Sequence, residues 1–130
     1  MAEYALESQK GSVSMKLQTE RGIITISSDV FTNLTGAAAT NCYGVKGMAI
    51  RSATDGLVHL LRRESMAKGV KVTTNEDSTI SLELHIIVEN GVNLMAISRA
   101  IMERVKYDVS RTTGGEVKNV DVFVDSMVIG

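Results

Sequence analysis

The sequence predicts an α+β fold: a single two-layer domain in which a mixed β-sheet carries its main helices on one face. Short segments of alternating apolar and polar residues, typical of half-buried strands, recur between residues 13 and 128. Segments with helical spacing of apolar residues lie between them. The 130 residues are enough for one domain with a sizeable core. The predicted order is β-β-α-β-α-β-β-α-β.

Composition narrows the class of protein. Apolar residues make up 44% and charged residues 22% of the chain, which is typical of a globular domain. The net charge of −1 gives no overall field that would attract nucleic acid or a membrane surface. A single cysteine excludes an internal disulfide. No leader segment and no apolar run of membrane-spanning length is visible, so we expect a cytoplasmic protein without direct membrane insertion.

The first part of the chain predicts two strands and a helix. Residues 1–11 are polar and are expected to form a flexible N-terminus, with the single domain occupying residues 12–130. Residues 13–17 alternate as a strand, and residues 23–26 form a second, β-branched strand. Ser27 or Ser28 can cap a following helix of small residues.

The middle of the chain predicts a strand and a second helix. Gly44 is a suitable stop for the first helix, and residues 45–51 then read as a strand. Residues 54–67 have leucines at helical spacing, so we expect a helix there with its leucines facing inward. These leucines are Leu57, Leu60 and Leu61.

The last part of the chain predicts a hairpin, a long helix and a final strand. Residues 70–74 and 79–89 flank a turn at residues 75–78. Asn93 is a good N-cap for a helix over residues 94–111, which Gly114-Gly115 ends. A strand at residues 117–128 completes the sheet.

Four sequence blocks occur in a distinctive order. They are Gly22 to Val30, a small-residue helix leading to Gly44-Val45 and Met48, Lys68 to Val72, and Val88 to Leu94 with Thr113-Gly114 and Val117 to Val124 beyond it. Together they resemble the alkaline shock protein family, also called the Gls general-stress family, of bacterial envelope-stress proteins. The resemblance implies an envelope-stress role, and for some members a link to the membrane through an anchored partner protein. It transfers no catalytic or ligand-binding residue.

The outward rows of the strands at 79–89 and 117–128 form a candidate interaction face. Apolar residues inside a polar face are typical of a contact surface, although a solvated sheet face is the simpler interpretation. Basic residues gather between Lys46 and Lys71 and on the long helix, which would make the opposite side basic and favour a homo-oligomer or a basic partner. The candidate face comprises Glu83, His85, Ile87, Asp121, Phe123 and Asp125.

Other chemical signals are weak. Gly44–Gly47 has the G-x-x-G form that clamps nucleic-acid backbone in KH domains, but a helix stop followed by a strand explains it more simply. Cys42 lies near a helix C-terminus and reads as a packing residue. His59 and His85 are too far apart in sequence to predict a metal site, and both read as surface residues.

We therefore expect a non-enzymatic cytoplasmic scaffold or adaptor for envelope stress, which acts through self-association and a membrane-anchored protein partner. No catalytic, cofactor-binding or metal-ligating residue is expected, and nucleic acid is not expected as a partner. The alternative is a KH-like module that binds single-stranded nucleic acid through the basic helices and the Gly44–Gly47 loop.

Overall fold

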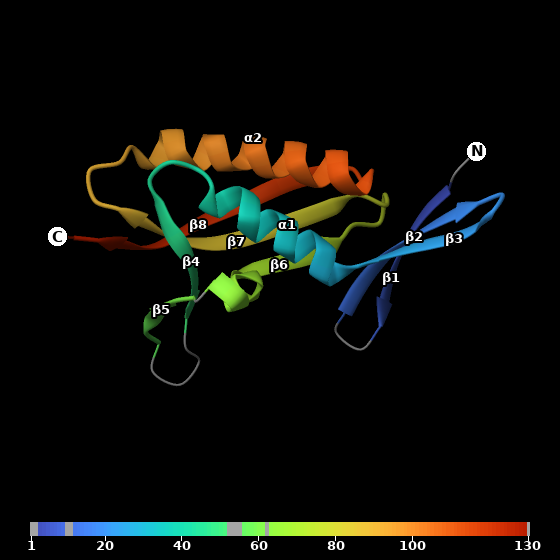
Figure 1. Cartoon of the computed structure of the whole chain (residues 1–130), viewed down its shortest axis with the longest axis horizontal. Helices are drawn as coiled ribbons and strands as arrows, with labels where there is room; N and C mark the ends of the chain where they lie inside the picture. Colours follow the sequence, from blue (N-terminus) through green and yellow to red (C-terminus); the bar gives the residue numbers. More distant parts are fainter. Residues whose placement is uncertain (1–2, 10–11, 52–55, 62, 130) are drawn as a thin grey trace.

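The computed structural model describes residues 3–9, 12–51, 56–61 and 63–129. Two helices lie side by side over one face of a five-stranded sheet, and a three-stranded sheet extends from one end (Figure 1). The elements are β1 (Glu3–Gln9), β2 (Ser12–Thr19), β3 (Gly22–Ser27), α1 (Ser28–Thr40), β4 (Val45–Arg51), β5 (Val58–Leu60), the 3₁₀ helix η1 (Arg63–Gly69), β6 (Val70–Thr74), β7 (Ile80–Glu89), α2 (Leu94–Thr113) and β8 (Val117–Val128). The predicted α+β class and the mixed sheet are confirmed.

Strand β7 is the centre of the larger sheet. Along one side it pairs antiparallel with β6 over its first half and with β4 over its second half. Along the other side it pairs with β8 in parallel over almost its whole length. The chain crosses from β7 to β8 through α2, because parallel neighbours need a crossover connection.

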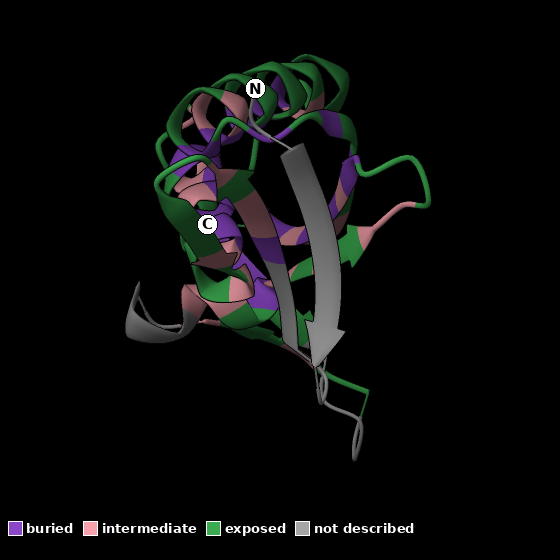
Figure 2. Cartoon of the chain, turned by 90° about the vertical axis from the view of Figure 1, so that its right-hand side faces the viewer, coloured by how far each residue is buried: buried purple, intermediate pink, exposed green. Residues whose placement is uncertain are grey.

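The core lies between the helices and the sheet, where Figure 2 shows the buried residues concentrated. Every second residue of β7 faces the helices, because strand side chains alternate between faces. Helix α2 covers them with a stripe of four buried apolar residues at helical spacing. The β7 residues are Ile80, Leu82, Leu84, Ile86 and Val88, and the α2 residues are Ile97, Ile101, Val105 and Val109.

Local sequence signals set the ends of α2 as predicted. The Asn93 side chain accepts a hydrogen bond from the backbone N–H of Ala96 at 3.0 Å, which satisfies one of the unpaired amides of the first turn. At the other end Gly114 adopts a left-handed conformation with φ of 77° and donates its N–H to the Ser110 carbonyl at 2.9 Å. Glycine adopts this conformation without steric cost.

The N-terminal segment differs from the prediction. Residues 3–9 form β1, which pairs antiparallel with β2, whereas the polar sequence of residues 1–11 predicted a flexible terminus. Strand β2 in turn connects the small sheet to the core, since Met15 is fully buried within the core cluster.

The predicted helix over residues 54–67 is wrong. The described part of this segment contains β5 and η1, while residues 52–55 and 62 lie outside the described residues. Gly56 has a φ of 71°, which is incompatible with an α-helix. Leu57 and Leu60, predicted to face inward, are exposed, and Leu61 alone of the three packs against the core.

Candidate functional site

The face of the larger sheet that points away from α1 and α2, here called the outer face, brings together most of the predicted interaction residues. The register of the parallel pair places Glu83 opposite Asp121 and His85 opposite Phe123. Directly opposite residues point to the same side of a sheet, so these four side chains share the outer face. The outward rows of β7 and β8 therefore lie side by side on the outer face.

His85 is held between two carboxylates. Its Nδ1 lies 2.9 Å from Asp125 Oδ2, and its Nε2 lies 3.2 Å from Glu83 Oε2. A neutral imidazole carries one N–H, so it can donate to one of these carboxylates; the imidazolium can donate to both. This arrangement fixes the plane of the ring on the outer face.

Phe123 lies against the fixed imidazole. The two ring centroids are 4.7 Å apart and the planes are inclined by 13°, which is a stacked arrangement. The stacking covers one side of the phenyl ring, yet 44% of the residue stays exposed. The outer face therefore presents an aromatic side chain whose orientation is already restricted.

Asp125 reaches His85 because of an irregularity in β8. The register shifts so that Val124 is opposite Ile86 and Ser126 is opposite Ile87, which makes Asp125 an extra residue between them. Its side chain is only 13% exposed.

Met127 follows the register shift in β8. It is opposite Val88, a core residue whose side chain points toward the helices. Met127 therefore lies on the helix side of the sheet, not among the acids of the outer face.

Ile87 was predicted to lie exposed on the candidate face, but it is buried. Only 6% of its surface is accessible. It is opposite Gly47 of β4, and a Cβ built on Gly47 would lie 2.8 Å from Cδ1 of Leu60. We conclude that Leu60 of β5 lies across this part of the outer face and helps to cover Ile87, while remaining half exposed itself.

Two lysines that the sequence reasoning did not assign to this face lie beside it. Lys71 of β6 is directly opposite Glu83. Lys68 and Lys71 line a hollow of about 370 Å³ on this face, together with Glu83, His85 and Asp125. The outer face is thus acidic along β7 and β8 but bordered by cations along β6. The alternation of β6 was visible in the sequence and could have indicated this position for Lys71.

The Gly44–Gly47 segment has a packing explanation. Gly44 has a φ of 86°, and a Cβ there would lie 2.5 Å from Ile97 Cδ1 and 2.9 Å from Val92 Cγ1. Gly47 lies inside β4, opposite Ile87. The segment joins a helix to a strand, whereas the KH loop joins two helices. Both glycines therefore permit close contacts within the fold.

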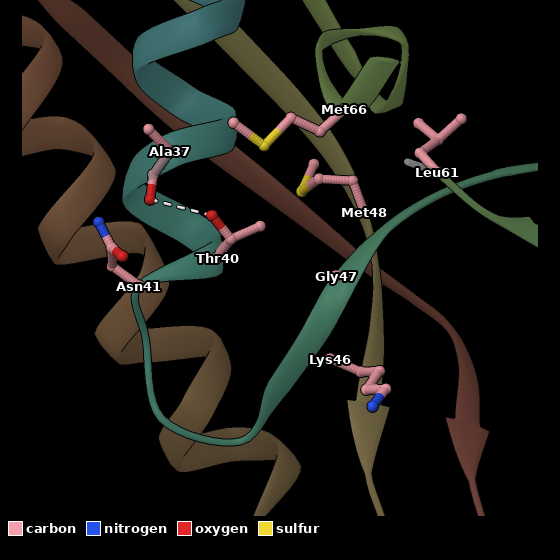
Figure 3. Close-up of a pocket in the computed structure, with 8 residues that line it drawn as sticks. All are labelled: Ala37, Thr40, Asn41, Lys46, Gly47, Met48, Leu61 and Met66. Carbon is pink, nitrogen blue, oxygen red and sulfur yellow. Dashed lines mark hydrogen bonds between the residues drawn. The ribbon is translucent and has the colours of Figure 1, made fainter. Parts of the chain in front are cut away.

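A second hollow, of about 400 Å³, lies on the helix side between α1, β4 and η1 (Figure 3). The sulfur-containing side chains of Met48 and Met66 point into it, and Met66 lies close to Gly36 of α1. The Thr40 hydroxyl donates to backbone carbonyls of its own helix, at 2.9 Å to Gly36 and 3.2 Å to Ala37. Lys46 is the one charged side chain that lines this hollow among the described residues.

Cys42 and His59 remain outside the candidate face. Cys42 packs against the core, as predicted, with Sγ 3.4 Å from the Ala38 carbonyl. Burial raises the pKa of the Cys42 thiol, and the nearby Arg104 guanidinium only partly opposes this. His59 lies on β5 and is exposed, rather than on a helix as predicted. Neither residue extends the site.

Two structural features are absent from the described part of the chain. Across residues 3–9, 12–51, 56–61 and 63–129, no three His, Cys, Asp or Glu side chains are grouped in a way that could hold a metal ion. Within the same ranges, no helix has the length and apolar character needed to cross a bilayer.

Comparison with known proteins assigns the chain. The model of the alkaline shock protein 23 family, described as having a cell envelope-related function, matches residues 16–129. The chain belongs to this family. It is 35% identical over 116 residues to the uncharacterized protein YloU of Bacillus subtilis (strain 168), covering 88% of this chain and 96% of YloU. It is also 36% identical over 118 residues to the uncharacterized protein Spy1614 of Streptococcus pyogenes serotype M6, covering 90% and 97% of the two chains.

Membership in the alkaline shock protein 23 family confirms the resemblance drawn from the four sequence blocks, and it implies a function related to the cell envelope. No solved structure matches this chain.

Proposed function

We propose that this member of the alkaline shock protein family is a non-enzymatic scaffold or adaptor of the cytoplasm, which supports the envelope under stress by self-association and by binding a membrane-anchored protein. The observation that carries the proposal is Phe123, an aromatic residue that stays 44% exposed in a row of ionisable side chains. Isolated apolar residues are common on surfaces. Phe123 differs because the His85 ring and its carboxylate partners restrict it.

Because the orientation of Phe123 is restricted before any partner binds, this residue is suited to an interface. A side chain that is already ordered loses little conformational entropy when a partner covers it. Exposed aromatic residues surrounded by polar groups are typical anchors of protein interfaces. Leu60, half exposed on the same face, adds a second apolar contact. The outer face therefore offers two apolar positions beside the acidic row of β7 and β8.

Charge distribution supports head-to-tail self-association. Exposed basic residues lie on α2, on the opposite side of the sheet from the acidic row of β7 and β8; they are Arg99, Lys106 and Arg111. Contact between unlike faces of successive copies is heterologous and produces chains or rings. Such contacts should weaken as salt is added, because ions screen exposed charges.

Sedimentation velocity tests self-association. We expect the wild-type protein to form larger species as its concentration rises, and more so at low salt. Phe123→Asp should remain monomeric, because it places a charge where the partner must bury an aromatic ring. Ile23→Asp is a matched control, since Ile23 is also exposed but lies on β3 in the other sheet. A wild-type protein that is monomeric at every concentration and salt level would refute the self-association.

The adaptor part of the proposal predicts peripheral membrane attachment. In fractionated cells the protein should sediment with membranes and be released by high salt, since it would be held by a protein contact with charged groups. The Phe123→Asp variant should move to the supernatant, whereas Ile23→Asp should not. Equal distribution of the two variants would argue against the outer face as the docking surface.

A further inference from the structure

Strand β8 presents an open edge. Among the described residues β8 pairs with β7 alone, because β4 and β6 together occupy the other side of β7. It is also long, at 12 residues. An edge strand exposes a row of outward N–H and C=O groups that can pair with another extended segment.

The helix side of this edge is apolar. Val122 and Val124 are only partly buried, although the residues opposite them on β7, Leu84 and Ile86, are fully buried. The valines stay partly open because no described strand lies beyond them. A further strand in this position would cover the rest of their surface.

Helix α2 adds two methionines above the same edge. Residues Ala100, Arg104 and Tyr107 border the groove between α2 and the end of α1. With 3.6 residues per turn, Met95 and Met102 fall on the flank of α2 opposite this groove. Because α2 packs against both α1 and β8, we infer that this flank lies on the β8 side. Both are exposed, Met95 by 65%. Methionine side chains adapt readily to different partners.

The outer side of the edge is acidic. Asp121 is exposed, whereas Asp125 on the same strand is only 13% exposed and lies against His85. A second β8 paired antiparallel about Phe123 would place Asp121 of each copy opposite Asp125 of the other, and like charges directly opposite one another repel. Basic side chains at these positions would instead be attracted to the carboxylates.

We propose that the β8 edge accepts an extended basic segment of a partner protein, which pairs as an additional strand and whose apolar and basic residues alternate. The apolar residues would fill the space below Met95 and Met102, beside Val122 and Val124. The basic residues would point to the outer side, toward Asp121. Backbone hydrogen bonds would supply affinity and the alternate side chains specificity. This inference rests on the proposed adaptor function and names the chemistry of its partner.

A synthetic peptide tests the proposal directly. The probe is a fluorescently labelled eight-residue peptide of alternating lysine and valine, with its binding followed by anisotropy. Two control peptides are used: one with lysines and valines in separate blocks, and one with glutamate in place of lysine. We expect both controls to bind at least about tenfold more weakly, because one loses the alternation and the other the charge attraction.

Variants of the full chain locate the bound peptide. Met95→Lys should weaken binding of the alternating peptide about tenfold, while Tyr107→Lys is the matched control, since Tyr107 is similarly exposed, at 59%, but lies on the α1 flank. Amide hydrogen exchange should slow at alternate residues of β8 when the peptide binds. Circular dichroism checks that both variants fold.

Three outcomes would overturn the inference: equal binding of the alternating and block peptides, unchanged binding by the Met95→Lys variant, or bound peptide without slower exchange in β8. Slowing of β8 exchange with protein concentration alone would instead identify a second copy as the occupant. Failure of the peptide while Phe123→Asp still abolishes self-association would refute the edge site and leave the proposed function intact. The reverse pattern would refute self-association and leave the edge site.

Discussion

The two faces of β7 and β8 contrast sharply although the same strands form both. On the helix side, alternate residues of β7 are fully buried under α1 and α2. On the outer face, His85, Phe123 and Asp121 are left partly or largely accessible. Burial of the first face explains the stability of the fold. The second face contributes little to it, yet its histidine, carboxylates and phenyl ring are arranged by specific contacts. This difference suggests that the outer face was shaped for contact with another molecule.

The contrast predicts the largest stability loss on the helix side. Leu84→Ala removes a fully buried side chain from the centre of the core, so we expect the free energy of unfolding to fall by about 2–5 kcal/mol. Urea denaturation followed by circular dichroism measures this loss. A loss no greater than that caused by outer-face substitutions would remove the distinction between the two faces.

Gly44 and Gly47, at the start of β4, have neighbours on different sides of the sheet. Gly44→Ala should cost about 1–3 kcal/mol, because φ is positive there and the new methyl group meets Ile97 and Val92 on the helix side. Gly47→Ala should change stability by only about 0.5 kcal/mol or less, since its neighbour is the end of the exposed Leu60 side chain. Thermal unfolding of both variants gives the comparison. Equal losses would show that the outer face near Gly47 is as tightly packed as the helix side.

On the outer face, Phe123→Ala should separate stability from assembly. We expect it to lower the free energy of unfolding by about 1 kcal/mol or less, the scale of an exposed aromatic stacking contact. It should nevertheless reduce self-association strongly. Denaturation and sedimentation of the same sample measure both effects. A large loss of stability with unchanged assembly would make Phe123 a structural residue.

The smallest expected effect is on the alkylation rate of Cys42, which lies on the helix side. Because burial raises the pKa of its thiol, a smaller fraction is thiolate at a given pH near neutrality than in the unfolded chain. Alkylation by iodoacetamide should therefore be slower in the folded protein than in urea, and the folded rate should rise as pH is raised toward the higher pKa. A folded rate that matches or exceeds the unfolded rate would contradict this.

Local sequence signals predicted much of the fold. The alternation from Ile80 to Val88 identified the core side of the central strand, and Asn93 and Gly114 marked the ends of α2 through contacts within a few residues. The outward row of the candidate site followed from the same alternation. These features depend on neighbouring residues, which is why the sequence alone reveals them.

The remaining features depend on contacts between distant segments. Ile87 is buried because β4 and β5 fold beside it, and Asp125 reaches His85 through a register shift in β8. Residues 54–67 have helical leucine spacing, yet the backbone at Gly56 and the pairing of β5 with β4 prevail. Strand β1 forms by pairing with β2 despite its polar sequence.

The position of Lys71 depends on the register between β6 and β7, and a shift of one residue would change it. A turn confined to residues 75–78 would pair Thr74 with Thr79. Instead Thr79 is retained in the turn by hydrogen bonds to Asn75 and Asp77, and Thr74 is opposite Ile80. This shift places Lys71 opposite Glu83 on the outer face.

Oxidative footprinting by hydroxyl radicals tests the central claim most directly, because the chain contains two phenylalanines. Phe31 is 1% exposed in the core and serves as an internal control, whereas Phe123 is 44% exposed on the outer face. We expect Phe123 to be oxidised readily in dilute protein and to become protected as the protein concentration rises, while Phe31 stays unreactive throughout. Oxidation of Phe123 that is negligible in dilute protein, or that stays the same at every concentration, would contradict this expectation.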